Sequence, residues 1–233
     1  MQSIALSIVM PVLNEASIIE AALRALAPFR AQRVEIVVVD GGSRDGTVAL
    51  AATGADRVIA GARGRAAQMN AGAAAARGDT LLFLHADTAL PSDAPVQVAA
   101  ALRRADGRSE SPAAWGRFDV RIAGRPRSLP VIAALMNLRS RWTGIATGDQ
   151  AMFVTRAAFD AVGGFPDQPL MEDVEMSRRL RRLSAPACLR ARVVTSGRRW
   201  EERGVWCTIV LMWRLRLFYS LGVAPERLAR SYR

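Results

Sequence analysis

The sequence predicts an α/β fold with a mostly parallel, Rossmann-like sheet and helices on both of its faces. Three observations carry this prediction. The first half alternates short apolar runs with helical patterns, the runs are rich in β-branched residues, and three of the runs end in polar clusters. Nearly continuous apolar runs are typical of parallel strands that helices cover on both sides.

Each expected element of the first half follows from its own pattern. The apolar runs at 4–13 (IALSIVMPVL), 34–39 (VEIVVV), 57–60 and 80–84 (TLLFL) predict strands, and the patterns at 15–26, 45–52 and 65–77 predict helices. Ligands of such sheets bind outside the carboxyl ends of the strands. The residues that follow the strands are therefore the first candidates for a site.

The second half has a less regular pattern. We expect strands at 115–122, with alternating faces, and at 151–155, an amphipathic helix at 130–142, and mobile loops at 104–112 and 167–170. Gly163 and Gly164 end a further helix, and Glu172 and Asp173 open the next one. This half predicts a second layer of structure around the sheet but no clear strand order.

Length and charge narrow the function classes. The 233 residues suit one large domain, and the formal net charge is +11. All 32 basic residues are arginines, which is typical of a biased base composition rather than of a nucleic-acid-binding face, so we expect no nucleic-acid partner. Arginine still favours anionic ligands, because its guanidinium matches phosphate oxygens. Two cysteines and no leader-type start predict reduced thiols and a cytoplasmic protein.

Polar clusters follow three of the predicted strands: PVLNE at 11–15, DGGSRDGT at 40–47 and HAD at 85–87. Asn14 and the residues at 43–45 are also common in turns and helix caps, so part of the pattern has a structural explanation. An aspartate directly after a buried strand, at Asp40 and again at Asp87, has no such explanation. The three clusters predict one shared crevice.

With the stretches GRAAQMNAGAAAARGDTLLFLHAD and VGGFPDQPLMEDVEMSRRLRR, these motifs resemble those of the inverting family-2 glycosyltransferases with the GT-A fold. The resemblance covers about 7–182 and depends on four motifs in the expected order. In detail, HAD and GDQ are similar to a bacterial subgroup linked to arsenosugar biosynthesis. The resemblance to the family implies a single GT-A domain over 1–233, with a nucleotide-binding half (1–104), an acceptor-binding half (105–200) and a C-terminal helical segment (201–233).

The resemblance implies donor-binding roles for a set of residues around the strand ends. Asp40 would accept hydrogen bonds from the nucleotide base, the 11–15 loop would enclose base and ribose, and Arg65 and Asn70 would hold nucleotide and diphosphate. The full set is Pro11, Asn14, Glu15, Asp40, Gly42, Ser43, Arg65, Asn70, His85, Asp87, Asp149, Gln150, Arg199 and Trp200.

HAD stands where the family usually has DxD. The resemblance implies that Asp87 binds Mg²⁺ or Mn²⁺, hard ions that prefer oxygen ligands. His85 departs from the pattern and would contact either the ribose or the metal. Such an ion neutralises charge on a departing diphosphate.

The resemblance makes Asp173, paired with Glu172, the base that takes the proton from the acceptor hydroxyl. A carboxylate at a helix start is also a common cap, which is the structural alternative. Asp149 and Gln150 would contact the acceptor or the donor sugar. Arg199 and Trp200 either serve the site or stack on each other and pack the C-terminal helix.

The expected function is metal-dependent, inverting transfer of a sugar from a nucleoside-diphosphate sugar, with UDP as the expected nucleotide, to a small or lipid-linked hydroxyl acceptor. The alternative is a catalytically weak, basic membrane- or nucleic-acid-binding module on the same fold. The segment 205–223 is too interrupted by Arg214 and Arg216 to span a membrane. It predicts a buried helix with snorkelling arginines, or else peripheral contact with the inner membrane face.

Overall fold

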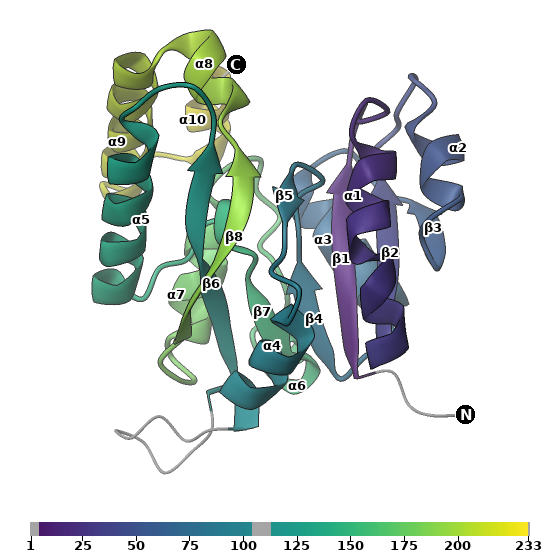
Figure 1. Ribbon diagram of the computed structural model, residues 1–233. Coiled ribbons are helices and arrows are strands. Elements are labelled where there is room, and N and C mark those ends of the chain that lie inside the picture. Colours follow the sequence, from purple (N-terminus) through teal and green to yellow (C-terminus); the bar gives the residue numbers. More distant parts are fainter. Residues whose placement is uncertain (1–4, 104–112, 233) are drawn as a thin grey trace.

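The computed structural model describes residues 5–103 and 113–232, and these form one curled sheet with helices on both faces (Figure 1). The strands are β1 (Leu6–Val12), β2 (Val34–Asp40), β3 (Arg57–Ala60), β4 (Thr80–Phe83), β5 (Thr88–Ala89), β6 (Trp115–Ala123), β7 (Phe153–Thr155) and β8 (Ala187–Ser196). Their order in the sheet is β3-β2-β1-β4-β7-β6-β8-β5. Strands β3, β2, β1 and β4 are parallel, β7 is antiparallel to β4 and β6, β8 is parallel to β6, and β5 is antiparallel to β8.

The helices are α1 (Ile19–Leu26), α2 (Thr47–Ala52), α3 (Arg65–Ala75), α4 (Ala94–Arg103), α5 (Leu129–Thr143), α6 (Arg156–Ala161), α7 (Glu172–Leu180), α8 (Arg198–Arg203), α9 (Val205–Ser220) and α10 (Pro225–Tyr232), with 3-10 turns at Ala27–Gln32 and Gly148–Gln150.

Alternate residues of the central strands enter two different cores, because successive side chains of a strand point to opposite faces. In β1, Ile8 and Met10 pack in the cluster that includes α1 and α5, whereas Val9 packs in the cluster that includes α3 and α7. In β2, Val38 and Val39 divide in the same way. The predicted mostly parallel sheet with helices on both faces is confirmed.

Several predicted boundaries shift by a few residues, and the strands β5 and β8 and the helices α4 and α8 were not predicted, whereas α10 lies in the predicted helical segment 201–233. The predicted helix at 15–26 begins only at Ile19, because Glu15 donates its backbone N–H to the hydroxyl of Thr47 and belongs to a turn. The loop predicted at 104–112 lies outside the described residues.

The predicted alternation of faces at 115–122 is wrong, because residues 115–120 are all buried. The strand β6 lies between β7 and β8 and is covered by α5. Two of its three charged residues are buried as a pair, since the Arg117 guanidinium donates to the Asp119 carboxylate, whereas Arg121 is exposed. Arg141 of α5 donates to the other oxygen of Asp119 at 2.7 Å, which compensates the buried charges.

The segment 205–223 differs most from the expectation. We expected 205–223 to form a buried helix, but in α9 only Thr208 and Leu215 are fully buried. Its tryptophans, Trp206 and Trp213, are mostly exposed. None of the helices within 5–103 and 113–232 is long and apolar enough to cross a membrane.

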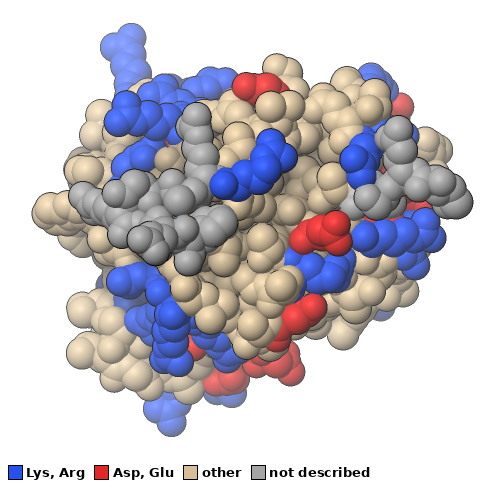
Figure 2. Space-filling model, turned by 90° about the horizontal axis from the view of Figure 1, so that it is seen from below, with Lys and Arg blue, Asp and Glu red and all other residues tan. Residues whose placement is uncertain are grey.

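On the face that Figure 2 shows, the arginines form several groups separated by uncharged residues, and acidic residues lie beside some of these groups. The arginines on this face therefore lie in separate groups and do not form one continuous basic surface there.

Candidate functional site

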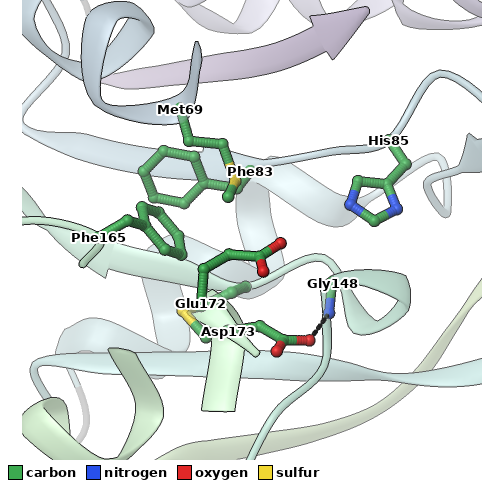
Figure 3. A pocket seen from close by; sticks show the side chains of 8 residues that line it. Met69, Phe83, His85, Gly148, Phe165, Glu172 and Asp173 are labelled. Carbon is green, nitrogen blue, oxygen red and sulfur yellow. Dashed lines mark hydrogen bonds between the residues drawn. The ribbon is translucent and has the colours of Figure 1, made fainter. Parts of the chain in front are cut away.

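A small pocket lies where the carboxyl end of β4 meets the start of α7 and the second 3-10 turn, Gly148–Gln150, which is called the 3-10 turn from here on (Figure 3). It is lined by Met69, Phe83, His85, Gly148, Met152, Phe165, Glu172 and Asp173. Apolar side chains form one side, and the carboxylates of Glu172 and Asp173 point into the space between that side and His85. An apolar pocket with a few convergent polar groups is the usual form of a binding site.

Asp173 is held in place by two backbone donors. Its Oδ2 accepts a hydrogen bond from Gly148 N at 2.9 Å, and its Oδ1 accepts one from Val174 N at 2.7 Å. Ser177, one turn later, donates to the Asp173 carbonyl and accepts from Ala146 N. These contacts fasten the first turn of α7 to the segment before the 3-10 turn, so the carboxylate has a fixed orientation.

Burial raises the pKa of both carboxyls of this pair. For Glu172, burial acts first and the charge of Asp173 adds to it. For Asp173, burial outweighs the opposing effect of the Gly148 and Val174 N–H groups. A carboxylate with a raised pKa is a better proton acceptor near neutral pH than an ordinary aspartate, and such pairs are common at active sites.

His85 and Asp149 form a second polar pair at the pocket edge. His85 Nδ1 lies 3.6 Å from Asp149 Oδ1. The imidazole also contacts Gly148 so closely that a Cβ at that position would lie 2.6 Å from its Cε1 atom. Burial acts to raise the pKa of Asp149, but the adjacent His85 and the charges of Arg65 and Arg199 outweigh it, so the pKa is lowered.

Two arginines from distant parts of the chain lie near this edge. Arg65 is exposed and opens α3, after Gly64 with φ of 135°. Arg199 of α8 places its guanidinium over the Tyr232 ring at 4.7 Å, so the predicted stack of Arg199 on Trp200 is wrong. Burial and then the charge of Arg65 lower the pKa of Arg199. Two cations this close together favour an anionic ligand between them.

Asp87 is exposed, and among the described residues its carboxylate accepts one long hydrogen bond, 3.3 Å, from the Thr88 hydroxyl. It lies close enough to Glu15 and Arg199 to affect the pKa of both. Within the described ranges, no three His, Cys, Asp or Glu side chains form a group that could hold a metal. Mg²⁺ in nucleotide sites often takes only one or two protein carboxylates together with phosphate oxygens and water, so a single exposed Asp87 fits such an ion.

The structure brings the loops that follow β1 and β2 together. Asn14, with φ of 55°, accepts from Arg44 N at 2.9 Å, and its own N–H donates to the Ser43 hydroxyl at 2.8 Å. The buried carboxylate of Asp40 accepts from the backbone N–H groups of Gly42 and Ser43. Carboxylate oxygens have further lone pairs, so these bonds leave capacity for a ligand donor.

Glu15 and Pro11 lie in the same region. The carboxyl of Glu15 is half-buried, and burial is the largest cause of its raised pKa, with Arg198 opposing and Asp87 reinforcing the rise. Pro11 is half-buried near the end of β1, beyond the residues that pair with β4. The absent N–H of proline therefore costs no ladder hydrogen bond on that side.

Two predicted site residues make structural contacts. Asn70 exchanges two 2.9 Å hydrogen bonds with the backbone of Phe165, so its amide holds the loop after α6. Gln150 is fully buried and closes a capping box with Thr147. Its side chain does not reach a ligand, and it fixes the 3-10 turn. Trp200 is partly buried against the apolar core, which is the packing role that we considered.

The sequence analysis missed Gly148 as a contact of both His85 and Asp173, and it missed the pocket-lining role of Phe165. It also gave no function to Arg139, whose Nε and Nη2 atoms are buried without a hydrogen-bond partner in the described structure. Burial lowers the pKa of Arg139, and the charge of Asp173 opposes this change. Arg139 is one of two arginines in the helix α5, and no pattern in the sequence distinguishes it from Arg141.

The comparisons with known proteins concern the fold and the family. PcManGT, a mannosyltransferase from Pyrobaculum calidifontis in complex with GDP-Man and Mn²⁺, is similar to the chain with a TM-score of 0.64 and 22% identity, over 93% of this chain and 61% of that one. TarS from S. aureus in complex with UDP gives a TM-score of 0.64 and 19% identity, over 82% and 60%. The chain thus spans about three fifths of the length of these proteins.

Glucosyl-3-phosphoglycerate synthase from Mycobacterium tuberculosis, in complex with Mg²⁺ and UDP, is similar with a TM-score of 0.60 and 22% identity, over 82% of this chain and 70% of that one. No curated protein matches the chain at a significant level. These likenesses show the GT-A fold. Residues 7–163, more than half of the chain, match Glycosyl transferase family 2. The chain belongs to glycosyl transferase family 2.

Proposed function

We propose that the protein transfers a sugar from a nucleoside-diphosphate sugar to a hydroxyl acceptor, with inversion at the anomeric carbon. The observation that carries the proposal is the carboxyl pair Glu172–Asp173, held in a pocket beside the charged edge formed by Asp87, Arg65 and Arg199. An inverting transfer needs a base on the acceptor side and stabilisation of the leaving group on the other.

Asp173 is the base in this proposal. Its raised pKa and its two backbone donors fit a group that takes the acceptor proton as the hydroxyl oxygen attacks the sugar. The Gly148 N–H keeps the carboxylate in one orientation, so little reorganisation is needed when the acceptor binds. Glu172 places a second carboxyl group beside Asp173, and burial followed by the charge of Asp173 raises the pKa of this carboxyl.

The leaving diphosphate is bound by the arginines. Arg65 and Arg199 supply fixed positive charge for its oxygens, and the anionic Asp149 orients His85 toward the same edge. Asp87 would hold Mg²⁺ or Mn²⁺ with the diphosphate, and such an ion neutralises charge that develops on the leaving group. The similar proteins PcManGT and glucosyl-3-phosphoglycerate synthase were obtained with Mn²⁺ and Mg²⁺, respectively, which supports a divalent ion.

We propose UDP as the nucleotide of the donor, with Asp40 accepting from the base, and a small or lipid-linked hydroxyl compound as the acceptor. TarS and glucosyl-3-phosphoglycerate synthase in complex with UDP support uridine, whereas PcManGT with GDP-Man makes guanosine the competitor. The halves 1–104 and 105–200 keep their proposed nucleotide and acceptor roles. Membership of the arsenosugar-linked subgroup is part of the proposal and would make the acceptor an arsenic-containing compound.

A thermal-shift screen tests the donor site. UDP or GDP with Mn²⁺ should raise the melting temperature, because a ligand that binds only the native state must stabilise it. Asp87→Ala should lose the response to metal. The matched control is Asp79→Ala, an exposed aspartate just before β4, which should respond like the wild type. Nucleotide binding that is independent of both Mn²⁺ and Asp87 would contradict the proposed metal-dependent donor site.

A further inference from the structure

Two helices expose apolar residues in regular stripes. On α5 the exposed large apolar residues are Val131, Leu135, Leu138 and Trp142, and on α9 they are Trp206, Val210, Trp213, Leu217 and the less exposed Phe218. In both helices the steps between the first four are four, three and four residues, so these four lie along one side of the helix. The three tryptophans are 90%, 78% and 74% exposed, in chain order, which is unusual for such large apolar side chains.

The two helices lie at the same edge of the molecule (Figure 1), and one side of each is already packed. Val205 and Ile209 of α9 pack against the cluster that contains Leu129 and Ile132 of α5. The stripes are therefore not misplaced core residues, since the core sides of both helices have partners. Stripes of this size at one edge of the molecule form an interaction surface.

The charges of these helices select the partner. Neither α5 nor α9 contains an aspartate or a glutamate, and their charged residues are all arginines, including the exposed Arg214. The chain as a whole carries a formal net charge of +11, so a second copy would be repelled and an anionic surface attracted. Tryptophans combined with arginines are typical of segments that lie in the interface of an anionic bilayer.

We propose that the exposed side of α5 and α9 docks the protein on an anionic lipid bilayer, with Trp142, Trp206 and Trp213 as interfacial anchors. The helices lie on the bilayer surface, and the tryptophan rings enter the boundary between headgroups and acyl chains. The inference depends on the fold and the surface, not on the proposed function. It would bring the pocket close to lipid-linked compounds, but it holds whatever reaction the pocket performs.

Vesicle co-sedimentation tests the surface. The wild type should bind vesicles of equal parts phosphatidylglycerol and phosphatidylcholine, with a blue shift of tryptophan fluorescence, and should bind pure phosphatidylcholine much less. Trp206→Ser with Trp213→Ser should weaken binding at least about tenfold, because both indoles lose their interfacial contact. The matched control, Val48→Ser with Val96→Ser, changes exposed apolar residues on α2 and α4 and should bind like the wild type.

All four positions are exposed, so both double variants should keep the wild-type melting temperature. Absence of binding to the anionic vesicles would overturn the proposal, as would equal binding by the tryptophan variant. Equal binding to pure phosphatidylcholine would overturn the role of charge. Sedimentation of the wild type as a dimer that the tryptophan variant dissociates, without vesicle binding, would assign the surface to a second copy.

Discussion

The carboxylates of Asp87 and Asp173 differ in how firmly the protein holds them. Asp173 is half-buried and accepts from two backbone N–H groups, whereas Asp87 is exposed and has one long contact, from Thr88. Reactions are accelerated when the reacting group is oriented in advance, whereas a ligand site can be completed by the ligand itself. The difference fits a fixed base on the acceptor side and an adaptable group on the donor side.

The local backbone explains the difference. Asp173 is the second residue of α7, where helix N–H groups have no partner within the helix, and the 3-10 turn adds the Gly148 N–H. Asp87 follows β4 in a loop, and its side chain points to solvent. The firm position of Asp173 depends on contacts between α7 and the distant segment 146–148, namely Gly148 with Asp173 and Ala146 with Ser177. Substitutions at Gly148 and at Ser177 test these two contacts separately.

The largest expected effect is that of Asp173→Asn. We expect the turnover number to fall by about 10²–10⁴-fold, because the amide cannot take the acceptor proton. Nucleotide affinity should stay unchanged, since Asp173 is not on the donor side of the proposal. Steady-state kinetics together with nucleotide titration separate the two effects.

The matched control for this variant is Asp160→Asn, an exposed aspartate on α6, which should keep wild-type activity. If Asp173→Asn keeps the wild-type turnover number, Asp173 only caps α7. Its firm position would then have no connection with catalysis.

A smaller effect is expected of Gly148→Ala. The added methyl group would lie 2.6 Å from the His85 ring, which must move, whereas the protein backbone need not. We expect activity to fall by about 10-fold and the melting temperature to change little, because a displaced group at an active site reduces rate even when the fold is intact.

The double variant with His85→Ala gives the matched test of this contact. If Gly148→Ala acts through the imidazole, it should have little further effect once the imidazole is gone, and a double-mutant cycle measures this. Two fully additive losses would show that Gly148 acts through Asp173 alone.

Ser177→Ala tests the support behind the base. The hydroxyl of Ser177 is buried and accepts from Ala146 N at 3.1 Å, so its removal leaves a buried donor without a partner. We expect a loss of about 1–3 kcal/mol in the free energy of unfolding. Urea unfolding measures the loss, and Ser128→Ala is the control, because Ser128 is exposed and makes no capping hydrogen bond. Equal stability of the two variants would mean that this contact contributes nothing.

The fold of the first half could be predicted because its strands, such as 34–39, are buried on both faces and are therefore almost entirely apolar, with Glu35 as the exception in this one. The strand β8 was not predicted, because Arg190 and Arg192 interrupt its apolar pattern. The exposure of α9 could not be predicted, since a helix that is apolar on all sides looks the same whether protein or another partner covers it.

The candidate site was predictable where chemistry follows a strand or opens a helix, as at Asp87 and Asp173. It was not predictable where a polar side chain bonds to a distant backbone. Asn70 is a good diphosphate ligand by type, but its partner is Phe165, and Gln150 is fixed by Thr147. Residue type and spacing indicate which groups can bind a ligand, whereas only the fold shows which of them already have partners.

The smallest expected effect is on the pH dependence of stability, through Glu172→Gln. Burial, reinforced by the charge of Asp173, raises the pKa of Glu172 in the folded protein, so folding disfavours its ionised form. Below the ordinary glutamate pKa the side chain is protonated in both states, and variant and wild type should be similarly stable. As the pH rises through the raised folded-state pKa, the wild type should lose stability relative to the variant, because the unfolded chain releases the proton more readily.

Urea unfolding between about pH 4 and pH 8 measures this difference in stability. The control variant Glu226→Gln, at an exposed position of α10, should show no such gain in stability over the wild type. If the free energies of unfolding of the wild type and of Glu172→Gln change with pH in the same way over this range, Glu172 is as well solvated as a surface carboxylate. The carboxyl pair on the acceptor side would then be no more shielded from water than Asp87 on the donor side.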